Sequence, residues 1–190
     1  MIDTVANSSG KHKAAIFLDR DGTLIEDVGY PRDPDAVRFL PGVIHALKSA
    51  YDRGWPLIVI SNQSGIGRGL ITPEEASAVH QRFVSELASQ GIELSGSYYC
   101  FHKPAERCIC RKPSPSMLFW AASDLGIDLC RSFMIGDKLS DMDAGHQAGC
   151  TTIQITLNDA SPNEIQTSAA FVTSNWDKVL KIIMASGGTH

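Results

Sequence analysis

The sequence of 190 residues lacks the features of several protein classes. It has no apolar stretch long enough to span a membrane, and its first thirteen residues are polar, without an apolar signal core. It has no stripe of lysine and arginine, its net charge is −4, and only 7% of its residues are aromatic. A nucleic-acid-binding protein would be expected to show a basic footprint and stacking aromatics. The absences therefore predict a cytoplasmic protein that binds neither membranes nor nucleic acids.

A disulfide framework is also missing, because the five cysteines are an odd number and the chain has no secretion signal. They indicate reduced thiols, some of them in a metal site. With 43% hydrophobic and 20% charged residues, the chain has the composition of a globular protein large enough to bury a core. We expect a single domain over residues 14–185, a flexible N-terminal segment at 1–13 and a flexible tail at 186–190.

Strand and helix signals alternate along the chain. Apolar runs predict strands at residues 14–18, 56–61, 97–101, 133–137, 151–156 and 169–172. Helices are expected at residues 41–53, 72–90, 114–126, 140–148 and 175–184. Thr72, Pro73 and Glu75 form a capping box, and Ser114 is expected to cap the next helix. The alternation predicts an α/β fold with a doubly wound, mostly parallel sheet.

Polar side chains follow three of the predicted strands. Asp19 and Asp21 come after the first, Ser61 and Asn62 close the second, Asp137 ends the fourth, and Lys112 lies in a loop. Each has a structural explanation, as a turn, a helix cap or a surface charge. Because the carboxyl ends of parallel strands meet at one edge of a sheet, we expect these groups to converge. Together they suit a hard cation and an anionic substrate.

These residues resemble the haloacid dehalogenase superfamily of phosphohydrolases. Its four motifs are matched by Asp19–Thr23, Ser61–Gln63, Lys112 and Gly136–Asp141. The resemblance implies a Rossmann-like fold, with Asp19 as a nucleophile that forms an aspartyl-phosphate and Asp21 as the acid and base. Positioning and charge neutralisation supply most of the rate in such phosphoryl transfers.

The resemblance also implies the ligands of the site. Magnesium would be bound by Asp19, by Asp137 and by the backbone carbonyl of Asp21. Ser61, Asn62 and Lys112 would hold the transferred phosphoryl group. Asp141 would orient Lys112 or a metal-bound water.

A second metal site is predicted by Cys100, His102, Cys108 and Cys110. Residues two apart in an extended chain point to the same side, so each pair can contact one ion. Three thiolates and an imidazole form a closed tetrahedral set, which suits a structural zinc ion. The alternative is a set of buried cysteines beside a surface histidine. Zinc would also fix the loop that carries Lys112, which lies two residues after Cys110.

The same loop resembles two subfamilies, the heptose 1,7-bisphosphate 7-phosphatases and the histidinol-phosphate phosphatases. The segment Ser61–Gly69 favours the heptose enzymes, whereas the five residues between His102 and Cys108 are as similar to the histidinol-phosphate enzymes. A bisphosphorylated sugar needs a second anion site, for which Arg68 and Arg111 are candidates. Arg68 is equally explained as a solvated loop residue. The heptose subfamily acts in the synthesis of nucleotide-activated heptose for lipopolysaccharide-type envelope glycans.

Between Asn62 and Lys112 there is room for one helix, one strand and the metal loop, so we expect no separate cap domain. An open site of this kind favours a small phosphorylated sugar as substrate, and a monomer is the default state. Two other classes stay open. A polynucleotide 3′-phosphatase would share the first motif, and a non-catalytic, zinc-stabilised interaction protein would not need the catalytic positions, all of which are retained here.

Overall fold

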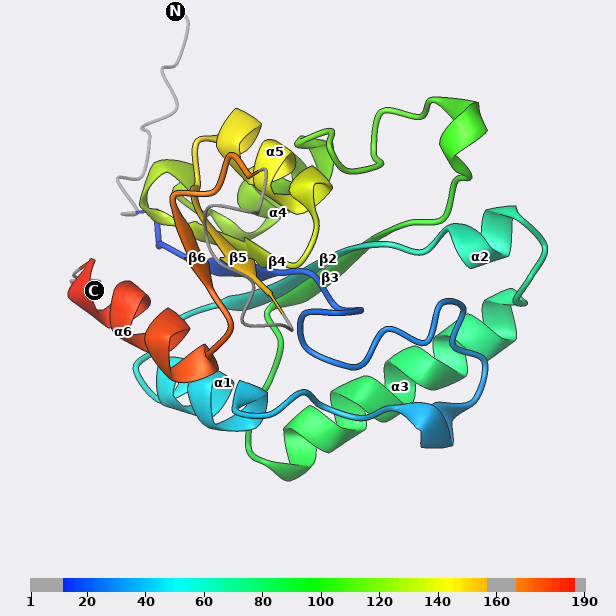
Figure 1. Cartoon of the computed structure of the whole chain (residues 1–190), viewed down its shortest axis with the longest axis horizontal. Coiled ribbons are helices and arrows are strands. Elements are labelled where there is room, and N and C mark those ends of the chain that lie inside the picture. Colours follow the sequence, from blue (N-terminus) through cyan, green and yellow to red (C-terminus); the bar gives the residue numbers. More distant parts are fainter. Residues whose placement is uncertain (1–11, 157–166, 187–190) are drawn as a thin grey trace, which may run out of the picture.

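The computed structural model of the protein describes residues 12–156 and 167–186, in which six strands form one sheet (Figure 1). The strands are β1 (Ile16–Leu18), β2 (Leu57–Asn62), β3 (Gly96–Cys100), β4 (Phe133–Gly136), β5 (Thr151–Ile155) and β6 (Phe171–Thr173). Their order is β3-β2-β1-β4-β5-β6, and every neighbouring pair is parallel. The predicted doubly wound parallel sheet is confirmed.

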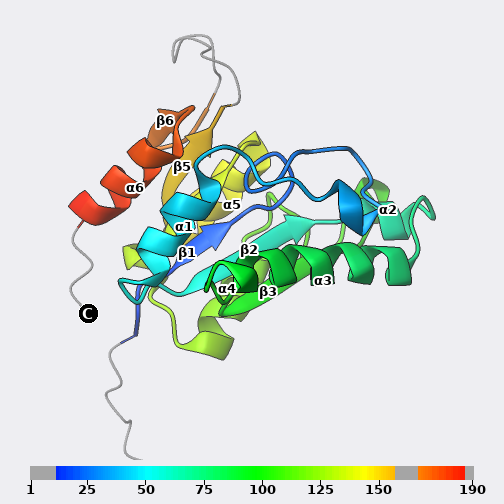
Figure 2. The ribbon, with the colours of Figure 1, turned by 90° about the horizontal axis from the view of Figure 1, so that it is seen from below.

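Helices cover both faces of this sheet. One face is covered by α1 (Val43–Tyr51), α3 (Pro73–Ser89) and α6 (Trp176–Ala185), and the other by α4 (Ser116–Leu125) and α5 (Leu139–Ala148) (Figures 1 and 2). Short 3-10 helices lie at Pro34–Ala36, Pro104–Glu106 and Leu129–Arg131. The described residues form no separate cap domain, as expected. Among them, no helix is both long and apolar enough to cross a bilayer.

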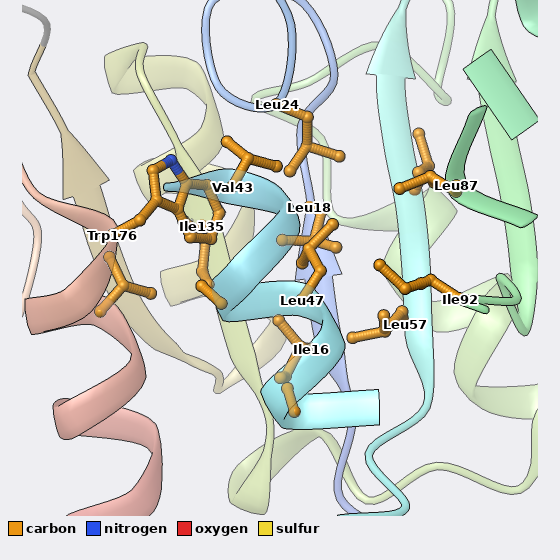
Figure 3. Packing of buried hydrophobic residues seen from close by; sticks show 14 of the residues in the cluster. Ile16, Leu18, Leu24, Val43, Leu47, Leu57, Leu87, Ile92, Ile135 and Trp176 are labelled. Carbon is orange, nitrogen blue, oxygen red and sulfur yellow. The ribbon is translucent and has the colours of Figure 1, made fainter. Parts of the chain in front are cut away.

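The apolar run at β1 is continuous because both of its faces are covered. Ile16 and Leu18 pack into the core beneath α1, α3 and α6 (Figure 3), whereas Ala15 and Phe17 pack into the core beneath α4 and α5. All four side chains are buried. Complete burial of a large apolar side chain contributes roughly 1.5–3 kcal/mol. The central strand is therefore fixed at the middle of the molecule, and the residue after it is held in place.

Local signals placed some helix ends well and others less well. The capping box at Thr72 and Glu75 is confirmed, with Pro73 as the first residue of α3. The predicted cap at Ser114 is wrong: α4 begins at Ser116 after Pro115. The Ser114 hydroxyl donates to the carbonyl of Ile109 in the preceding loop, and its oxygen accepts a long hydrogen bond from Ser116 N at 3.4 Å. Ser114 therefore connects the loop to the start of α4 from one position before the N-cap.

The segment between β2 and β3 holds one more helix than the sequence predicted. The short helix α2 (Ser64–Gly67) precedes α3. Its residues are rich in glycine, so their apolar periodicity carries no helix signal. The helix turns the chain sharply after Asn62 and places the following loop beside the end of β3, where Gly67 N donates to the Phe101 carbonyl at 3.1 Å.

The expected terminal segments, 1–13 and 186–190, fall almost wholly outside the described residues. Lys13 is an exception, because its amide donates to Gly126 O at 3.1 Å and its carbonyl accepts from Asp128 N at 2.9 Å. These two bonds form a bridge with Ile127. The chain is therefore already paired with its neighbours one residue before the predicted start of the domain.

Candidate active site

The predicted site residues gather where the sheet changes winding direction. β1 lies between β2 and β4, and the chain proceeds outward from it in both directions. Asp19 follows β1, and its amide donates to Ile135 O in β4 at 2.9 Å. Asp137 follows β4. Open α/β sheets bind ligands at such a switch point, outside the carboxyl ends of the strands.

Three carboxylates meet at this point. Oxygen atoms of Asp19, Asp137 and Asp141 all lie within 4.8 Å of one another. Burial raises the pKa of Asp19 to about 7. The positive charge of Lys112 lowers this pKa, whereas the negative charges of Asp141 and Asp137 raise it further. Burial also raises the pKa of Asp137. The three negative charges repel one another at this distance. A magnesium ion prefers oxygen ligands, and binding it here would offset the repulsion, so the group suits this ion.

Gly22 makes room for one of these carboxylates. Its φ is +87°, and a Cβ atom at this position would lie 2.5 Å from Asp137 Oδ2. Thr23 donates to Asp137 Oδ1 at 3.3 Å. The turn after β1 therefore needs a residue that tolerates a left-handed backbone and has no side chain.

Lys112 lies at the centre of a buried ionic group. Its ammonium is 2.6 Å from Asp19 Oδ1 and 2.7 Å from Asp141 Oδ1, and it donates to Ile60 O at 2.7 Å. Burial alone would lower the pKa of Lys112, but the two carboxylates raise it. The lysine is thus held as a cation beside Asp19, the predicted nucleophile, and Asp141 is in contact with it as expected.

Asn62 fixes the backbone of Lys112. The Asn62 side chain donates to Lys112 O and accepts from Lys112 N, both at 3.1 Å. This two-way bond uses one of the two hydrogens of the Asn62 side-chain nitrogen, so the predicted contact of Asn62 with the phosphoryl group stays a prediction. Ser61 is buried at the end of β2 and accepts a hydrogen bond from Gln63 at 2.9 Å.

Asp21 is not one of the three clustered carboxylates, but it lines the same small cavity as Asp19 and Asp141, and it is held by groups that the sequence analysis did not single out. Arg20 Nε and Nη2 donate to its two carboxylate oxygens, each at 3.1 Å, and Gln63 donates to Oδ2. Arg20 lies in the first of the four matched motifs and Gln63 in the second. Nothing in their spacing indicates that both contact Asp21, so they could not be distinguished from ordinary turn residues.

A cavity of about 360 Å³ opens beside these groups. Its wall includes Asp21, Asp27, Arg111, Lys112 and Lys138. Lys138 is half exposed and its ammonium is 3.0 Å from Asp27 Oδ2. The wall is formed by loops together with the end of β2 and the first residues of α2 and α5.

The two arginines that were candidates for a second anion site lie in different places. Arg111 lines the cavity. Arg68 is exposed at the end of α2 and is not part of the cavity wall. Lys138, which the sequence analysis did not select, lines the cavity as well and is a second candidate, besides Arg111, for the second anion site.

The Cys/His loop forms a compact cluster after β3. The cysteine sulfurs lie 3.2–3.5 Å apart, and His102 Nδ1 lies 3.2 Å from Cys110 Sγ. All four ligand atoms are within 4.8 Å of one another. Tetrahedral ligands at zinc–sulfur distances would be about 3.8 Å apart, so the cluster fits this ion. Cys130 and Cys150 are free thiols outside the cluster.

This cluster is directly connected to the cavity. Arg111 and Lys112 follow Cys110, and Arg111 Nη1 donates to His102 O at 3.5 Å. If the four side chains bind one ion, the loop would have little freedom at the next two residues. The placement of two cations of the site by this cluster stays a prediction.

Comparison with known proteins agrees with this geometry. The HAD-hydrolase-like family model matches residues 109–178. The D-glycero-beta-D-manno-heptose-1,7-bisphosphate 7-phosphatase of Yersinia pestis is 39% identical over 163 residues, which cover 82% of this chain and 86% of the relative. The Escherichia coli K12 phosphatase of the same name is 42% identical over 149 residues, covering 75% and 78%.

A solved structure shows the same fold. The D,D-heptose 1,7-bisphosphate phosphatase of B. bronchiseptica, complexed with magnesium and phosphate, superposes with a TM-score of 0.83 and 28% identity. The alignment covers 92% of this chain and 99% of that one. The chain therefore belongs to the haloacid dehalogenase superfamily, in the family of the D-glycero-beta-D-manno-heptose-1,7-bisphosphate 7-phosphatases.

Proposed function

We propose that this chain is a magnesium-dependent phosphatase that removes the 7-phosphate of D-glycero-D-manno-heptose 1,7-bisphosphate. The observation that carries the proposal is the buried group formed by Asp19, Lys112 and Asp141 beside Asp137. This group supports the proposal because its carboxylates suit a nucleophile and hard metal ligands, and its lysine suits a cation beside the phosphoryl group, all at the switch point of the sheet. The family supports the substrate, because both curated relatives described above carry this name.

The reaction proceeds in two steps. A carboxylate oxygen of Asp19 attacks phosphorus and the bond to the sugar oxygen breaks, while Asp21 gives that oxygen a proton. Asp21 then takes a proton from a water molecule, whose oxygen attacks the aspartyl-phosphate and releases Asp19. The products are heptose 1-phosphate and inorganic phosphate. Lys112 and the Ser61 hydroxyl stabilise the transferred group, because fixed donors need no reorganisation during the reaction.

Asp19, Asp137 and the backbone carbonyl of Asp21 would hold magnesium, which would neutralise charge on the phosphoryl oxygens. Asp141 keeps Lys112 in place. Asn62 positions the same residue through its backbone, so we infer that it acts on the phosphoryl group through Lys112.

The remaining phosphate of the bisphosphate would contact Arg111 and Lys138, which lie in the same cavity as Lys112. Two cationic side chains in one cavity can bind the phosphate group that is not hydrolysed. Arg68 lies outside this cavity wall and is a weaker candidate.

The Cys100–Cys110 loop would bind zinc for structure alone, since four protein ligands leave no position for water. We also propose that the protein acts as a monomer in the cytoplasm. The site residues named above come from one chain, and the clustered free thiols suit a reducing compartment. The pathway would be the synthesis of nucleotide-activated heptose.

The test compares magnesium-dependent phosphate release from heptose 1,7-bisphosphate and from histidinol phosphate. A strong preference for the bisphosphate is expected, because histidinol phosphate has no second phosphate for Arg111. Asp19→Asn should abolish release, while the surface control Asp52→Asn should not change it. A preference for histidinol phosphate, or turnover by Asp19→Asn, would contradict the proposal.

A further inference from the structure

We propose that Arg20 and Gln63 are positioning residues that hold the carboxyl group of Asp21 for both proton transfers. The inference rests on the proposed function, in which Asp21 is the acid and base. Both side chains donate hydrogen bonds to the Asp21 carboxylate, and we name this pair the Arg20–Gln63 clamp.

Arg20 contributes two parallel bonds to this clamp. Its Nε and Nη2 atoms bind the two carboxylate oxygens of Asp21, each at 3.1 Å. A two-bond contact between a guanidinium and a carboxylate fixes direction as well as distance. The Arg20 side chain is 3% exposed and that of Asp21 is 13% exposed, so neither is free to move into solvent.

Stability alone does not explain why this arginine is buried. Among the described residues, Asp21 is the one carboxylate within ion-pair distance of Arg20. Removing two charges from water costs about as much as their attraction returns, so a buried ion pair is weak evidence for stabilisation. On its other side the guanidinium lies 5.7 Å from the centre of the Tyr99 ring and lines a largely apolar cavity of about 310 Å³. The surroundings therefore direct its hydrogen bonds toward Asp21.

Gln63 completes the clamp and connects it to the phosphoryl site. Its side-chain nitrogen donates one hydrogen to Asp21 Oδ2 and the other to Ser61 Oγ, at 2.9 Å in the second case. Because the Ser61 oxygen accepts this bond, its own hydrogen stays available for a phosphoryl oxygen. One amide thus orients both the acid and base group and a phosphoryl-binding hydroxyl.

The clamp matters because the terminal torsion of aspartate is soft. The χ2 angle of Asp has no sharp staggered preference, so an unclamped carboxyl group rotates freely. Proton transfer requires the group within hydrogen-bond reach of the leaving oxygen. Asp21 also lines the catalytic cavity, so the clamp leaves part of its carboxylate facing the substrate. Loss of the clamp should impair proton transfer while leaving Asp19 and Lys112 in place.

The experiment separates proton transfer from attack on phosphorus by changing the leaving group. A sugar oxygen must gain a proton to leave, whereas dinitrophenolate leaves without one. We would measure kcat/KM of wild type, Arg20→Met and Gln63→Met with heptose 1,7-bisphosphate and with 2,4-dinitrophenyl phosphate. Arg82→Met is the matched control, because Arg82 forms ion pairs on the surface of α3.

The clamp predicts different losses for the two substrates. Arg20→Met should lower kcat/KM for the sugar phosphate about 100-fold and for dinitrophenyl phosphate less than about threefold, since acid–base catalysis contributes about 10²–10⁴-fold. With dinitrophenyl phosphate the variant should also show a burst of one equivalent of dinitrophenol, because hydrolysis of the aspartyl-phosphate still needs Asp21 as a base. Gln63→Met should lower kcat/KM for both substrates to some extent, because Gln63 also orients Ser61, and should lower it further for the sugar phosphate, by less than Arg20→Met does.

Equal losses for both substrates would overturn the proposal and indicate a merely structural role. If Arg20→Met fails to fold, Gln63→Met decides the question by the same criterion. A wild type that does not cleave heptose bisphosphate would contradict the proposed function alone. The comparison would then use histidinol phosphate, whose alkyl leaving oxygen also needs a proton.

Discussion

Replacing Lys112 by methionine should destabilise the protein strongly and in a pH-dependent manner. The ammonium of Lys112 lies 2.6 Å from Asp19 and 2.7 Å from Asp141, and all three side chains are buried. Methionine preserves the volume of the aliphatic chain but removes the charge. Two buried carboxylates would then have no cation beside them unless a metal is bound.

The size of the loss follows from this geometry. Removing one partner of a buried ion pair costs about 3–5 kcal/mol, because the charge left behind is not compensated. Burial already raises the pKa of Asp19 from its ordinary value of 3.8 to about 7. A carboxyl group with a raised pKa stabilises the folded state fully below its unfolded pKa, and this contribution is lost as the pH rises through its folded pKa. The loss of Lys112 should raise this pKa further, so Lys112→Met should be least harmful in mild acid.

Urea unfolding without added magnesium would measure this effect. We expect the difference in unfolding free energy between wild type and Lys112→Met to be about 3–5 kcal/mol near pH 8 and smaller by at least about 1 kcal/mol near pH 6. Lys138→Met is the control, because its half-exposed ammonium should contribute less than about 1 kcal/mol. A similar loss for both variants, or a loss for Lys112→Met that is unchanged with pH, would refute the reasoning.

Three further predictions follow from the site. Gly22→Ala should weaken magnesium binding at least about tenfold and destabilise the fold by about 1–3 kcal/mol, because of backbone strain and displacement of Asp137. Calorimetric titration would measure the magnesium affinity and urea unfolding the stability, and an unchanged magnesium affinity would contradict the prediction. Arg111→Met should raise KM for the bisphosphate about tenfold or more while Arg68→Met changes it less than about twofold; steady-state kinetics would show whether this order is reversed. Cys108→Ser should lower zinc content and phosphatase activity together, since the loop carries two cations of the site; full activity in folded, zinc-free protein would disprove the coupling.

Most of the sheet could be predicted because its strands are buried on both faces. The run before Asp19 is apolar at every position, as a central parallel strand requires, and β1 indeed forms the centre of the sheet. Helix ends were predicted where the cap is local, as at Thr72. The start of α4 was missed because Pro115, and not Ser114, takes the N-cap position, while the Ser114 hydroxyl donates to the Ile109 carbonyl of the preceding loop.

Part of the candidate site could also be predicted from the sequence, and part of it could not. The motifs placed Asp19, Asp137 and Lys112 together because strand ends meet at one edge. In the structure Lys112 forms an ion pair with Asp19, and a carboxylate oxygen of Asp137 lies within 4.8 Å of one of Asp19. The sequence could not rank Arg111 above Arg68, since Arg111 directly precedes Lys112 and Arg68 follows the Ser61–Gln63 motif by a few positions. Their difference depends on the direction in which each loop leaves the sheet.

The sequence by itself determined which strands end in polar groups, and it determined the Cys/His cluster, whose four side chains lie within eleven residues from Cys100 to Cys110. The strand ends and the Cys/His cluster could be predicted because each depends on the spacing of residues that are close together in the chain. Only the tertiary structure decided the partners of the charged groups. Lys112 lies between Asp19 and Asp141, and Arg20 turns to Asp21 because the apolar surroundings of Tyr99 offer its guanidinium no other carboxylate among the described residues. A charged side chain is long and flexible, so its direction is set by the burial and charge of elements that lie far away in the chain.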